Sequence, residues 1–292
     1  MPGVNFDRAA SFYDATRALP EGVADQVADA ILRCVGAGPN TRFLEVGIGT
    51  GRIALPLILA GYAYCGIDLS ASMLGTLRRK LTGHPERRTR TGLALADAMS
   101  LPLRAGAVDV VLMIHLLHLV DDHVCTLHEA RRVLRPGGRI IVSADEFAEG
   151  NRRDRAAGRE ATGWRLVTNR WNAVLADLGV DRTTREQGRW LADAAIVEAL
   201  AEIGASTERV VLARYRERPQ TARERVAAHQ ARIYSSDWGI PDDIHAEASR
   251  RLDRWLETEH RAPDERFVDQ SAVVVLIGAF SSRDGAIGGT AA

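Results

Sequence analysis

The sequence predicts an open α/β fold with a mostly parallel sheet, and three observations predict it. Short apolar runs alternate with helix-like segments between residues 41 and 146. These runs are apolar throughout, which indicates strands buried on both faces. A glycine-rich turn, GIGTG at residues 47–51, follows the first run. Sheets of this kind bind their ligands at the carboxyl ends of the strands.

Five strands and three helices are expected in the first half of the chain. The strands are expected at residues 41–47, 63–70, 91–97, 107–115 and 139–146. The helices are expected at 51–62, 70–81 and 121–135, where apolar residues recur with helical spacing. Ser70 is expected to cap the second helix, because a serine hydroxyl accepts from backbone N–H groups of a first turn. The residues Pro136, Gly137 and Gly138 predict a turn before the fifth strand.

The second half is predicted to complete the sheet and to add two helical insertions. A polar, arginine-rich helical segment is expected at 149–179, a helix at 191–204, strands at 207–218 and 271–280, and a helical stretch at about 221–260, broken at 235–243. The predicted boundaries are an N-terminal helical cap at 1–30, an α/β core at 31–148, a helical insertion at 149–188, the remainder of the core at 189–280 with an insertion at about 219–262, and a disordered tail at 281–292.

The overall composition favours a cytoplasmic protein with a small-molecule ligand. Acidic and basic residues balance to a formal net charge of zero, which argues against a nucleic-acid binder with its usual basic excess. Lys80 is the only lysine. No secretory signal or membrane span is expected, because the start lacks a cationic and apolar pattern and the apolar runs are short. The three cysteines lack metal or disulfide spacing.

The glycine-rich turn does not fit the two commonest nucleotide motifs. A dinucleotide fingerprint needs a third glycine where this chain has Arg52. A phosphate-binding P-loop needs a Gly-Lys-Ser/Thr sequence, which does not follow. Glu45, at the end of the first strand, would repel a pyrophosphate and suits a ligand with a positive centre. S-adenosylmethionine fits, since it has a sulfonium, an ammonium group and no phosphate.

Three acids follow three successive strands, and together they predict one binding edge. Glu45 ends the first strand, Asp68 ends the second, and Asp97 lies near the end of the third. The Asp68 carboxylate is placed to accept from both ribose hydroxyls of the cofactor. Asp97 is placed to accept from the exocyclic amine of the adenine. One such aspartate alone usually caps a helix or turn, so the prediction rests on the three together.

At these residues the chain resembles a known family. LEVGIGTG, GIDLSASML, ADAMSLPL, VDVVLMIHLLHLVDD and RVLRPGGRIIVS are similar to consecutive motifs of the class I S-adenosylmethionine-dependent methyltransferases, nearest the ubiquinone/menaquinone-biosynthesis-like (type 11) group. The resemblance is close over residues 6–143 and implies a Rossmann-like sheet of seven strands, the last antiparallel, with helical cap insertions. The residues that it implies around the cofactor are Tyr13, Glu45, Gly47, Gly49, Gly51, Asp68, Leu69, Met73, Asp97, Ala98 and Ile114.

Methyl transfer needs alignment of the reactants and exclusion of water, and it needs a base only for some acceptors. His115, just after the fourth strand, is the first candidate for such a base, and a residue that only lines the pocket is the alternative. His118 matches a family position with a structural role, and Asp145 and Glu146 are second-rank candidates. A metal site among His115, His118, Asp121, Asp122, His123, Cys125 and His128 is rejected. The two histidines of the helix, five residues apart, point in different directions.

The acceptor is expected to be a small molecule, such as a secondary metabolite or a quinone-like compound. Aromatic residues of the insertions, which could hold it or pack the cap, are Trp164, Trp171, Trp190, Tyr234 and Trp238. The arginines 152, 153, 155 and 159 could meet an anionic acceptor or form a solvated helix face. A nucleic-acid or protein methyltransferase, and a cofactor-binding protein that transfers no methyl group, stay open. So does the choice between monomer and homodimer.

Overall fold

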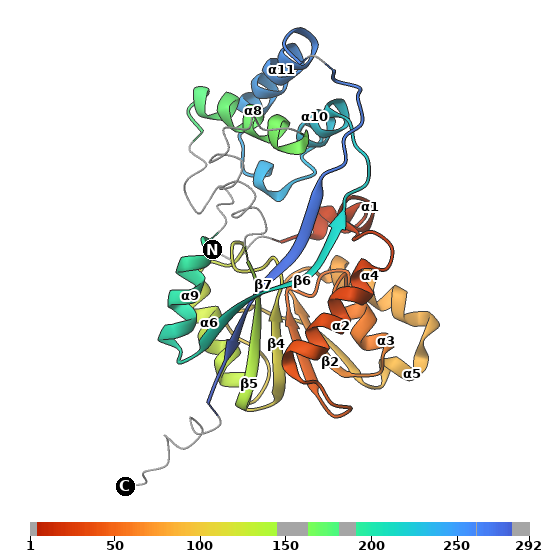
Figure 1. Ribbon diagram of the computed structural model, residues 1–292, viewed down its shortest axis with the longest axis vertical. Coiled ribbons are helices and arrows are strands. Elements are labelled where there is room, and N and C mark those ends of the chain that lie inside the picture. The colour runs from red at the N-terminus through yellow and green to blue at the C-terminus, as the bar shows by residue number, and fades with distance from the viewer. Residues whose placement is uncertain (1–4, 145–162, 181–190, 261, 282–292) are drawn as a thin grey trace. The chain divides into compact units, whose positions relative to one another are not determined.

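The computed structural model describes residues 5–144, 163–180, 191–260 and 262–281 (Figure 1), and they form two compact units. Unit 1 contains most of the sheet and is made of residues 1–145, 191–213 and 272–292. Unit 2 is mainly helical and is made of residues 146–190 and 214–271. The expected side chains Asp145, Glu146 and Trp190, the four arginines between 152 and 159 and the tail from 282 lie outside the described residues.

The strands of unit 1 follow one another in the order β3-β2-β1-β4-β5-β7-β6. Their bounds are β1 Arg42–Val46, β2 Ala63–Asp68, β3 Thr91–Leu95, β4 Val108–Met113, β5 Leu134–Ser143, β6 Ser206–Arg216 and β7 Gln270–Ala279. The first five strands are parallel, and β7 runs antiparallel to β5. This order confirms the predicted Rossmann-like class I methyltransferase sheet of seven strands and the closing pair of strands near the C-terminal end.

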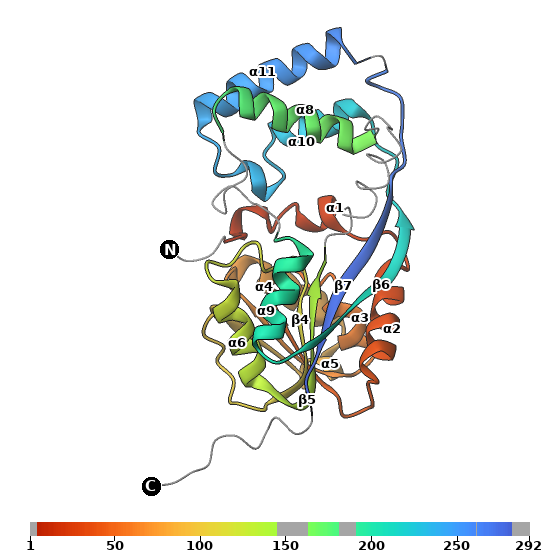
Figure 2. The same ribbon diagram turned by 60° about the vertical axis from the view of Figure 1, so that its left-hand side comes forward.

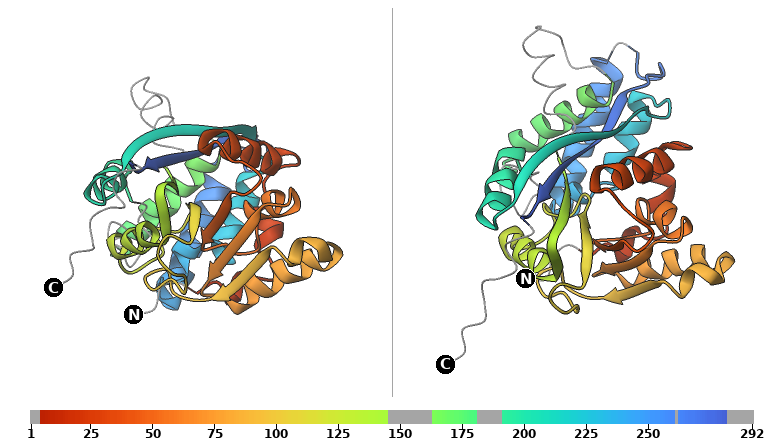
Figure 3. Two further views of the ribbon diagram at one scale, coloured as in Figure 1. Left: turned by 90° about the horizontal axis from the view of Figure 1, so that it is seen from below. Right: turned by 60° about the horizontal axis from the view of Figure 1, so that its bottom comes forward.

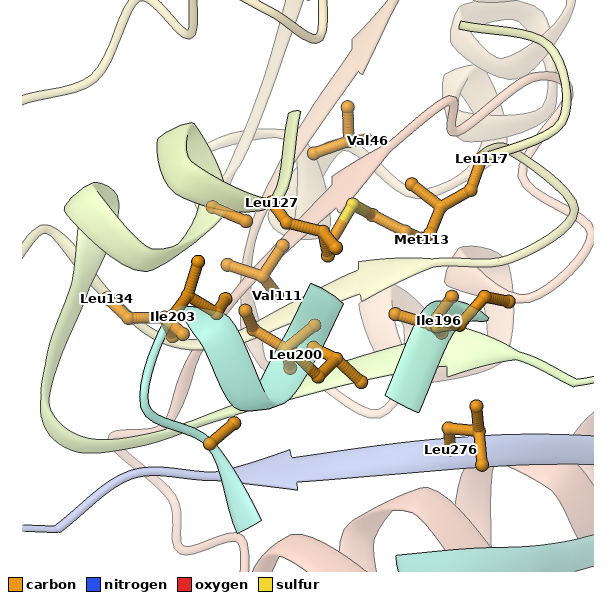
Figure 4. Close-up of a cluster of buried hydrophobic side chains, with 14 of the residues drawn as sticks. Val46, Val111, Met113, Leu117, Leu127, Leu134, Ile196, Leu200, Ile203 and Leu276 are labelled. Atoms are coloured by element: carbon orange, nitrogen blue, oxygen red, sulfur yellow. The ribbon is translucent and has the colours of Figure 1, made fainter. Parts of the chain in front are cut away.

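Helices cover both faces of the sheet (Figure 3). The described helices of unit 1 are η1 Asp7–Ala9, α1 Tyr13–Arg17, α2 Val23–Val35, α3 Ala54–Leu59, α4 Ala71–Lys80, η2 Leu81–Gly83, α5 Pro85–Arg88, α6 His123–Val133 and α9 Asp193–Glu202. On one face α6 and α9 pack together, and their apolar side chains join those of the strands (Figure 4). Leu127, Leu200 and Val111, drawn there from α6, α9 and β4, are fully buried.

The prediction of a simple turn before β5 is wrong, because that strand begins at Leu134 and contains the Pro-Gly-Gly sequence. Leu134 pairs with Val108, whereas Arg139 pairs with Val110, so the ladder contains an irregularity between these pairs. Gly137 lies at its centre with a φ of +76°. Extra residues opposite a short stretch of β4 must bulge, and glycine permits the backbone conformation that a bulge requires.

Unit 2 is built around three helices that pack on one another (Figure 2). They are α8 Gly163–Asp177, α10 Ala222–Gln230 and α11 Asp242–Thr258, and the short helix η4 Ser235–Asp237 precedes α11. Thr221 and Glu224 form a capping box at the start of α10, each side chain accepting from the other residue's backbone N–H. Among the described residues, no helix combines the length and the apolar character that crossing a bilayer requires.

Candidate functional site

The glycine-rich turn leaves β1 in a conformation that only glycines adopt easily. Gly47, Gly49 and Gly51 have φ angles of +74°, +57° and +82°. The backbone N–H groups of Gly47 and Ile48 both donate to the carbonyl of Ile67 in β2, at 2.8 and 3.0 Å. The turn is therefore held against the neighbouring strand of the sheet.

The three glycines have different surroundings. A Cβ atom at Gly47 would lie 2.8 Å from Leu116 Cδ1, and one at Gly51 would lie 2.6 Å from Leu77 Cδ1. At Gly49 a Cβ atom would meet nothing within 4 Å. Gly47 and Gly51 thus allow close packing within the protein. Gly49 faces open space, where a ligand could approach the backbone.

Asp68 joins this turn to the turn that follows β2. One carboxylate oxygen accepts from the backbone N–H of Gly49 at 2.7 Å, and the other accepts from that of Ser70 at 2.8 Å. Burial raises the pKa of Asp68 above its ordinary value, while these backbone hydrogen bonds act in the opposite direction. The residue predicted to bind the ribose therefore also organises both loops around it.

Glu45 is a buried carboxyl group on β1, and its side chain is only 3% exposed. It accepts a hydrogen bond of 2.7 Å from the hydroxyl of Tyr64 on β2, the strand beside it. Burial raises the pKa of Glu45 to about 8, against the opposing effects of the Tyr64 hydrogen bond and of Arg52. The side chain is therefore mostly neutral at pH 7 when no ligand is present.

Most of the remaining predicted cofactor residues lie in the loops that follow β2, β3 and β4, whereas Met73 lies in the first turn of α4. Asp97 follows β3 and accepts from the N–H of Met99 at 2.8 Å, and the N–H of Ala96 donates to the Asp68 carbonyl at 3.1 Å. These contacts bring the Asp97 loop to the end of β2. Among the predicted cofactor residues of this group, the side chains are half-buried or buried, and Met73 is only 1% exposed. The other members of this group are Leu69, Ala98 and Ile114.

Tyr13 begins α1 and is half-buried. Its ring makes an edge contact with Phe6, with 6.2 Å between the ring centroids. The segment around it contacts the loops described above: Ser70 Oγ donates to Asp7 at 2.6 Å, and Asn5 Nδ2 donates to the Leu69 carbonyl at 3.3 Å. The structure therefore places the N-terminal segment beside the loop after β2.

His115 follows β4 with a φ of +56°, in the left-handed region that residues with a side chain rarely adopt. Its backbone N–H donates to the hydroxyl of Ser143, at the end of β5, at 2.9 Å. Strained backbone of this kind persists only where the surroundings enforce it, and it is concentrated at functional sites. Ser143, which is 7% exposed, supplies one such constraint.

The two histidines after β4 are held neutral. Burial lowers the pKa of His115 well below its ordinary value, and the nearby Arg52, His118 and Arg17 lower it further. Burial also lowers the pKa of His118, to about 4. A neutral imidazole can accept a proton, so His115 has the protonation state that a base requires, although its low pKa makes it a weak one.

One of the acidic residues considered for a metal site has a structural role. Asp122 caps α6, accepting at 2.9 Å from the N–H groups of Val124 and Cys125. Within the described part of the chain, no three His, Cys, Asp or Glu side chains converge as metal ligands would.

The described aromatic residues of the insertions take part in the packing of unit 2. Trp171 is fully buried, and its indole N–H donates to Asp237 at 3.0 Å. The Trp238 indole donates to the Arg232 carbonyl at 2.8 Å, and Arg225 donates to the Tyr234 hydroxyl. The side chain of Trp164 lies outside the described residues.

Two residues of the site were missed from the sequence. Tyr64, the partner of Glu45, lies on the same face of the sheet, as the parallel pairing of β1 with β2 would have indicated. Ser143, which binds the His115 backbone, ends a strand that pairs with β4. No local signal points to it, because its role depends on the conformation of His115.

Comparison with known proteins identifies the stretch that carries this site. Residues 44–142 match the methyltransferase domain family. Over 190 residues the chain is 33% identical to malonyl-[acyl-carrier protein] O-methyltransferase of Methylococcus capsulatus, covering 64% of each chain. Over 138 residues it is 34% identical to demethylmenaquinone methyltransferase of Clavibacter sepedonicus, covering 47% of this chain and 55% of that one. The chain thus spans between half and two thirds of these relatives.

The fold is similar to that of a solved structure. A putative methyltransferase of Bacillus halodurans aligns with a TM-score of 0.56 at 13% identity, covering 88% of this chain and 99% of that one. This likeness supports the seven-stranded architecture and carries no information about substrates.

Proposed function

We propose that this chain is an S-adenosylmethionine-dependent methyltransferase acting on a small molecule. Its residues 44–142 match the methyltransferase domain family, in the class I group that includes the ubiquinone/menaquinone-biosynthesis enzymes. One observation carries the proposal: carboxyl groups lie at or just after the ends of three adjacent strands around a glycine turn. Gly49 faces open space there, and Asp68 binds its N–H.

These residues fit S-adenosylmethionine better than a phosphate-containing nucleotide. Asp68 and Asp97 offer acceptors for ribose hydroxyls and an adenine amine, and Glu45 offers a carboxyl group that a nearby ammonium group would favour in its ionised form. Bound there, the cofactor supplies an electrophilic methyl group on its sulfonium. Gly49 lets the backbone approach the ligand, while Gly47 and Gly51 keep the turn packed on Leu116 and Leu77. Leu69, Met73, Ala98 and Ile114 complete the proposed cofactor surroundings, and Tyr13 closes them.

The chain's own contribution to the reaction is orientation, exclusion of water and, for some acceptors, proton removal. Orientation of two reactants contributes about 7–11 kcal/mol in well-aligned cases, so a base is not required for every acceptor. His115 is the residue that accepts a proton when the acceptor is a hydroxyl or an acidic carbon, because its ring is neutral. Otherwise the same ring forms a wall of the site.

The acceptor is a small molecule, and two points support this part of the proposal. One relative at about one third identity is named for demethylmenaquinone, which is a small molecule. The formal net charge of zero lacks the basic excess that nucleic-acid binders usually carry. We propose that the protein acts in the cytoplasm.

Cofactor identity is tested first. S-adenosylhomocysteine should bind with micromolar or tighter affinity by calorimetry, and neither NAD nor ATP should compete. Tight binding of NAD would overturn the assignment of the glycine turn. A panel of metabolites is then incubated with the protein and S-adenosylmethionine labelled in the methyl group. Transfer of label to a small molecule supports the proposal, whereas transfer only to nucleic acid or protein would favour the other acceptor class. Binding without transfer to any acceptor would favour a protein that transfers no methyl group.

A further inference from the structure

The only lysine of the chain, Lys80, lies at the end of α4 in a closed set of three contacts. Its ammonium nitrogen lies 2.8 Å from a carboxylate oxygen of Asp14 and donates to the backbone carbonyl of Thr50 at 2.9 Å. The Thr50 hydroxyl donates to the other Asp14 oxygen at 2.6 Å. Each of the three residues therefore binds both of the others.

These contacts join two segments that flank the proposed cofactor site. Thr50 is fully buried and lies between Gly49 and Gly51, so its position fixes the middle of the glycine turn. Asp14 follows Tyr13 in α1. Arg52 makes a second link between the same segments by donating to the Arg17 carbonyl at 3.2 Å.

We propose that Lys80 is a positioning residue for cofactor binding, acting through Thr50 and Asp14 to hold the glycine turn and the Tyr13 segment in their binding conformation. The inference rests on the proposed function, since it assigns Lys80 to the same site. The proposed effect of Lys80 is indirect, because its ammonium group binds Asp14 and Thr50.

The argument is one of preorganisation. Three glycines with positive φ make the turn intrinsically flexible, so a ligand that needs one conformation loses affinity if the free turn samples several. The Lys80 ammonium group binds the Thr50 carbonyl, and the Asp14 carboxylate accepts from the Thr50 hydroxyl. Together these contacts hold the turn in one conformation before a ligand binds. The same carboxylate fixes α1, a helix of five residues that is too short to be stable alone.

The test compares Lys80→Met with Lys80→Arg, and Arg79→Met is the matched control. Arg79 is the neighbouring cation on α4, is exposed, and donates to Thr76 within its own helix. Two quantities are measured: the dissociation constant of S-adenosylhomocysteine, and hydrogen exchange of the peptide that contains residues 12–18. A melting temperature for each variant separates local effects from unfolding.

Lys80→Met should weaken binding about five- to thirtyfold, as expected for a partly exposed charged contact, and should speed exchange in residues 12–18. Lys80→Arg should recover most of the affinity, and Arg79→Met should behave like the unchanged protein. Equal affinity in Lys80→Met and the unchanged protein would overturn the inference and leave the proposed function standing. The inference would also be overturned if Lys80→Arg did not recover the affinity lost in Lys80→Met and if the loss of affinity paralleled a fall in melting temperature. Failure of the unchanged protein to bind S-adenosylhomocysteine would overturn the proposed function, and this inference with it.

Discussion

The two units bury polar side chains in different places. Among the described residues of unit 1, four of the five buried polar residues lie at the ends of strands or in the loops that follow them, outside the apolar cluster beneath α6 and α9: Glu45, Thr50, Ser70 and Ser143. The fifth, Thr126, lies in α6, where its hydroxyl donates to the Asp122 carbonyl. In unit 2 the buried residues His229, Asp237 and His245 contact Trp171, which belongs to the apolar core. Polar burial in unit 1 is therefore concentrated at the proposed binding edge, whereas in unit 2 it specifies how the helices pack.

The largest expected effect is on the core of unit 2. Asp237→Ala removes the acceptor of Trp171 and the partner of His229, whose Nδ1 lies 2.9 Å from the carboxylate. Breaking a buried pair of this kind costs about 3–5 kcal/mol of unfolding free energy. The tryptophans whose side chains are described, Trp171, Trp238 and Trp255, lie in unit 2, so tryptophan fluorescence in urea follows the unfolding of this unit.

Binding of S-adenosylhomocysteine to Asp237→Ala in the absence of urea should stay within about twofold of normal, because the contacts of Asp237 belong to the core of unit 2, whereas the proposed cofactor residues belong to unit 1. The control is Asp243→Ala, an exposed residue in the first turn of α11. If affinity fell together with the stability of unit 2, cofactor binding would depend on the core of unit 2, contrary to this prediction.

Asp68→Ala tests the binding edge of unit 1. It removes the carboxylate proposed for the ribose and also the acceptor of the Gly49 and Ser70 N–H groups. Each charge-assisted hydrogen bond contributes about 1.5–3 kcal/mol. Affinity for S-adenosylhomocysteine should therefore fall about ten- to a few hundredfold, with Asp68→Asn intermediate and the fold retained by circular dichroism. An unchanged dissociation constant would place the adenosine elsewhere.

Glu45 connects the binding edge to pH. Its pKa of about 8 means that the free carboxyl group holds a proton at pH 7, whereas a positively charged ligand favours the carboxylate. Binding should therefore release a proton and tighten as pH rises from 6 towards 8, by at most about tenfold per unit, before levelling off. Calorimetry in buffers of different ionisation enthalpy measures this release. Glu45→Gln has no ionisable group at this position, so the proton release that Glu45 contributes should disappear.

The same carboxyl group affects stability, and the sign follows from its raised pKa. The unfolded chain ionises at the ordinary value near 4.5, whereas the folded chain keeps the proton up to about 8. The folded state therefore binds more protons between these values, and the stability contributed by this group falls as pH rises through that window. Glu45→Gln should flatten this part of the stability profile, which denaturant titrations at pH 5, 7 and 9 would reveal.

His115 gives the smallest expected change in stability. His115→Gly relieves a positive φ in a residue with a side chain, and should raise the free energy of unfolding by about 1 kcal/mol. Gly also loses more chain entropy on folding, which offsets part of the gain. An unchanged or lower stability would indicate that the ring's contacts outweigh the strain.

The role of His115 in the reaction is resolved by single-turnover rates between pH 5 and 9. Since the pKa of His115 lies well below 6.5, its ionisation should affect the rate only at the acid end, with a flat profile above pH 7. If the ring is a base, His115→Gln and His115→Ala should both be about a hundred- to ten-thousandfold slower at the chemical step. If it is a wall, His115→Gln should retain most activity.

Most of the sheet could be predicted because it depends on local pattern. Continuous apolar runs such as residues 107–115 indicate buried parallel strands whatever their partners are. The start of β5 was missed because Pro136 and the two glycines after it carry a strong turn signal, and only pairing with β4 shows that they form an irregularity within the strand.

The binding edge was predictable to the extent that it follows strand ends. Glu45, Asp68 and Asp97 could be identified because parallel strands bring their carboxyl ends to one edge. The contacts of Lys80, Asp14 and Thr50 could not, because they join residues 30 to 66 positions apart without a spacing rule. The polar core of unit 2 was missed for the same reason: Trp171 and Asp237 come from different helices and are isolated in the sequence.

The position of β7 has a consequence for the order in which the chain folds. This strand is made last, yet it lies between β5 and β6 in the sheet, and Ser143 pairs with Val275, about 130 residues further along. During synthesis the parallel strands emerge early, and one edge of β5 has no partner until residues 270–279 leave the ribosome. An apolar strand with an open edge is prone to pair with another chain. Pairing between residues so far apart in the sequence is slow, so we expect the open edge of β5 to be exposed to pairing with another chain until β7 is in place.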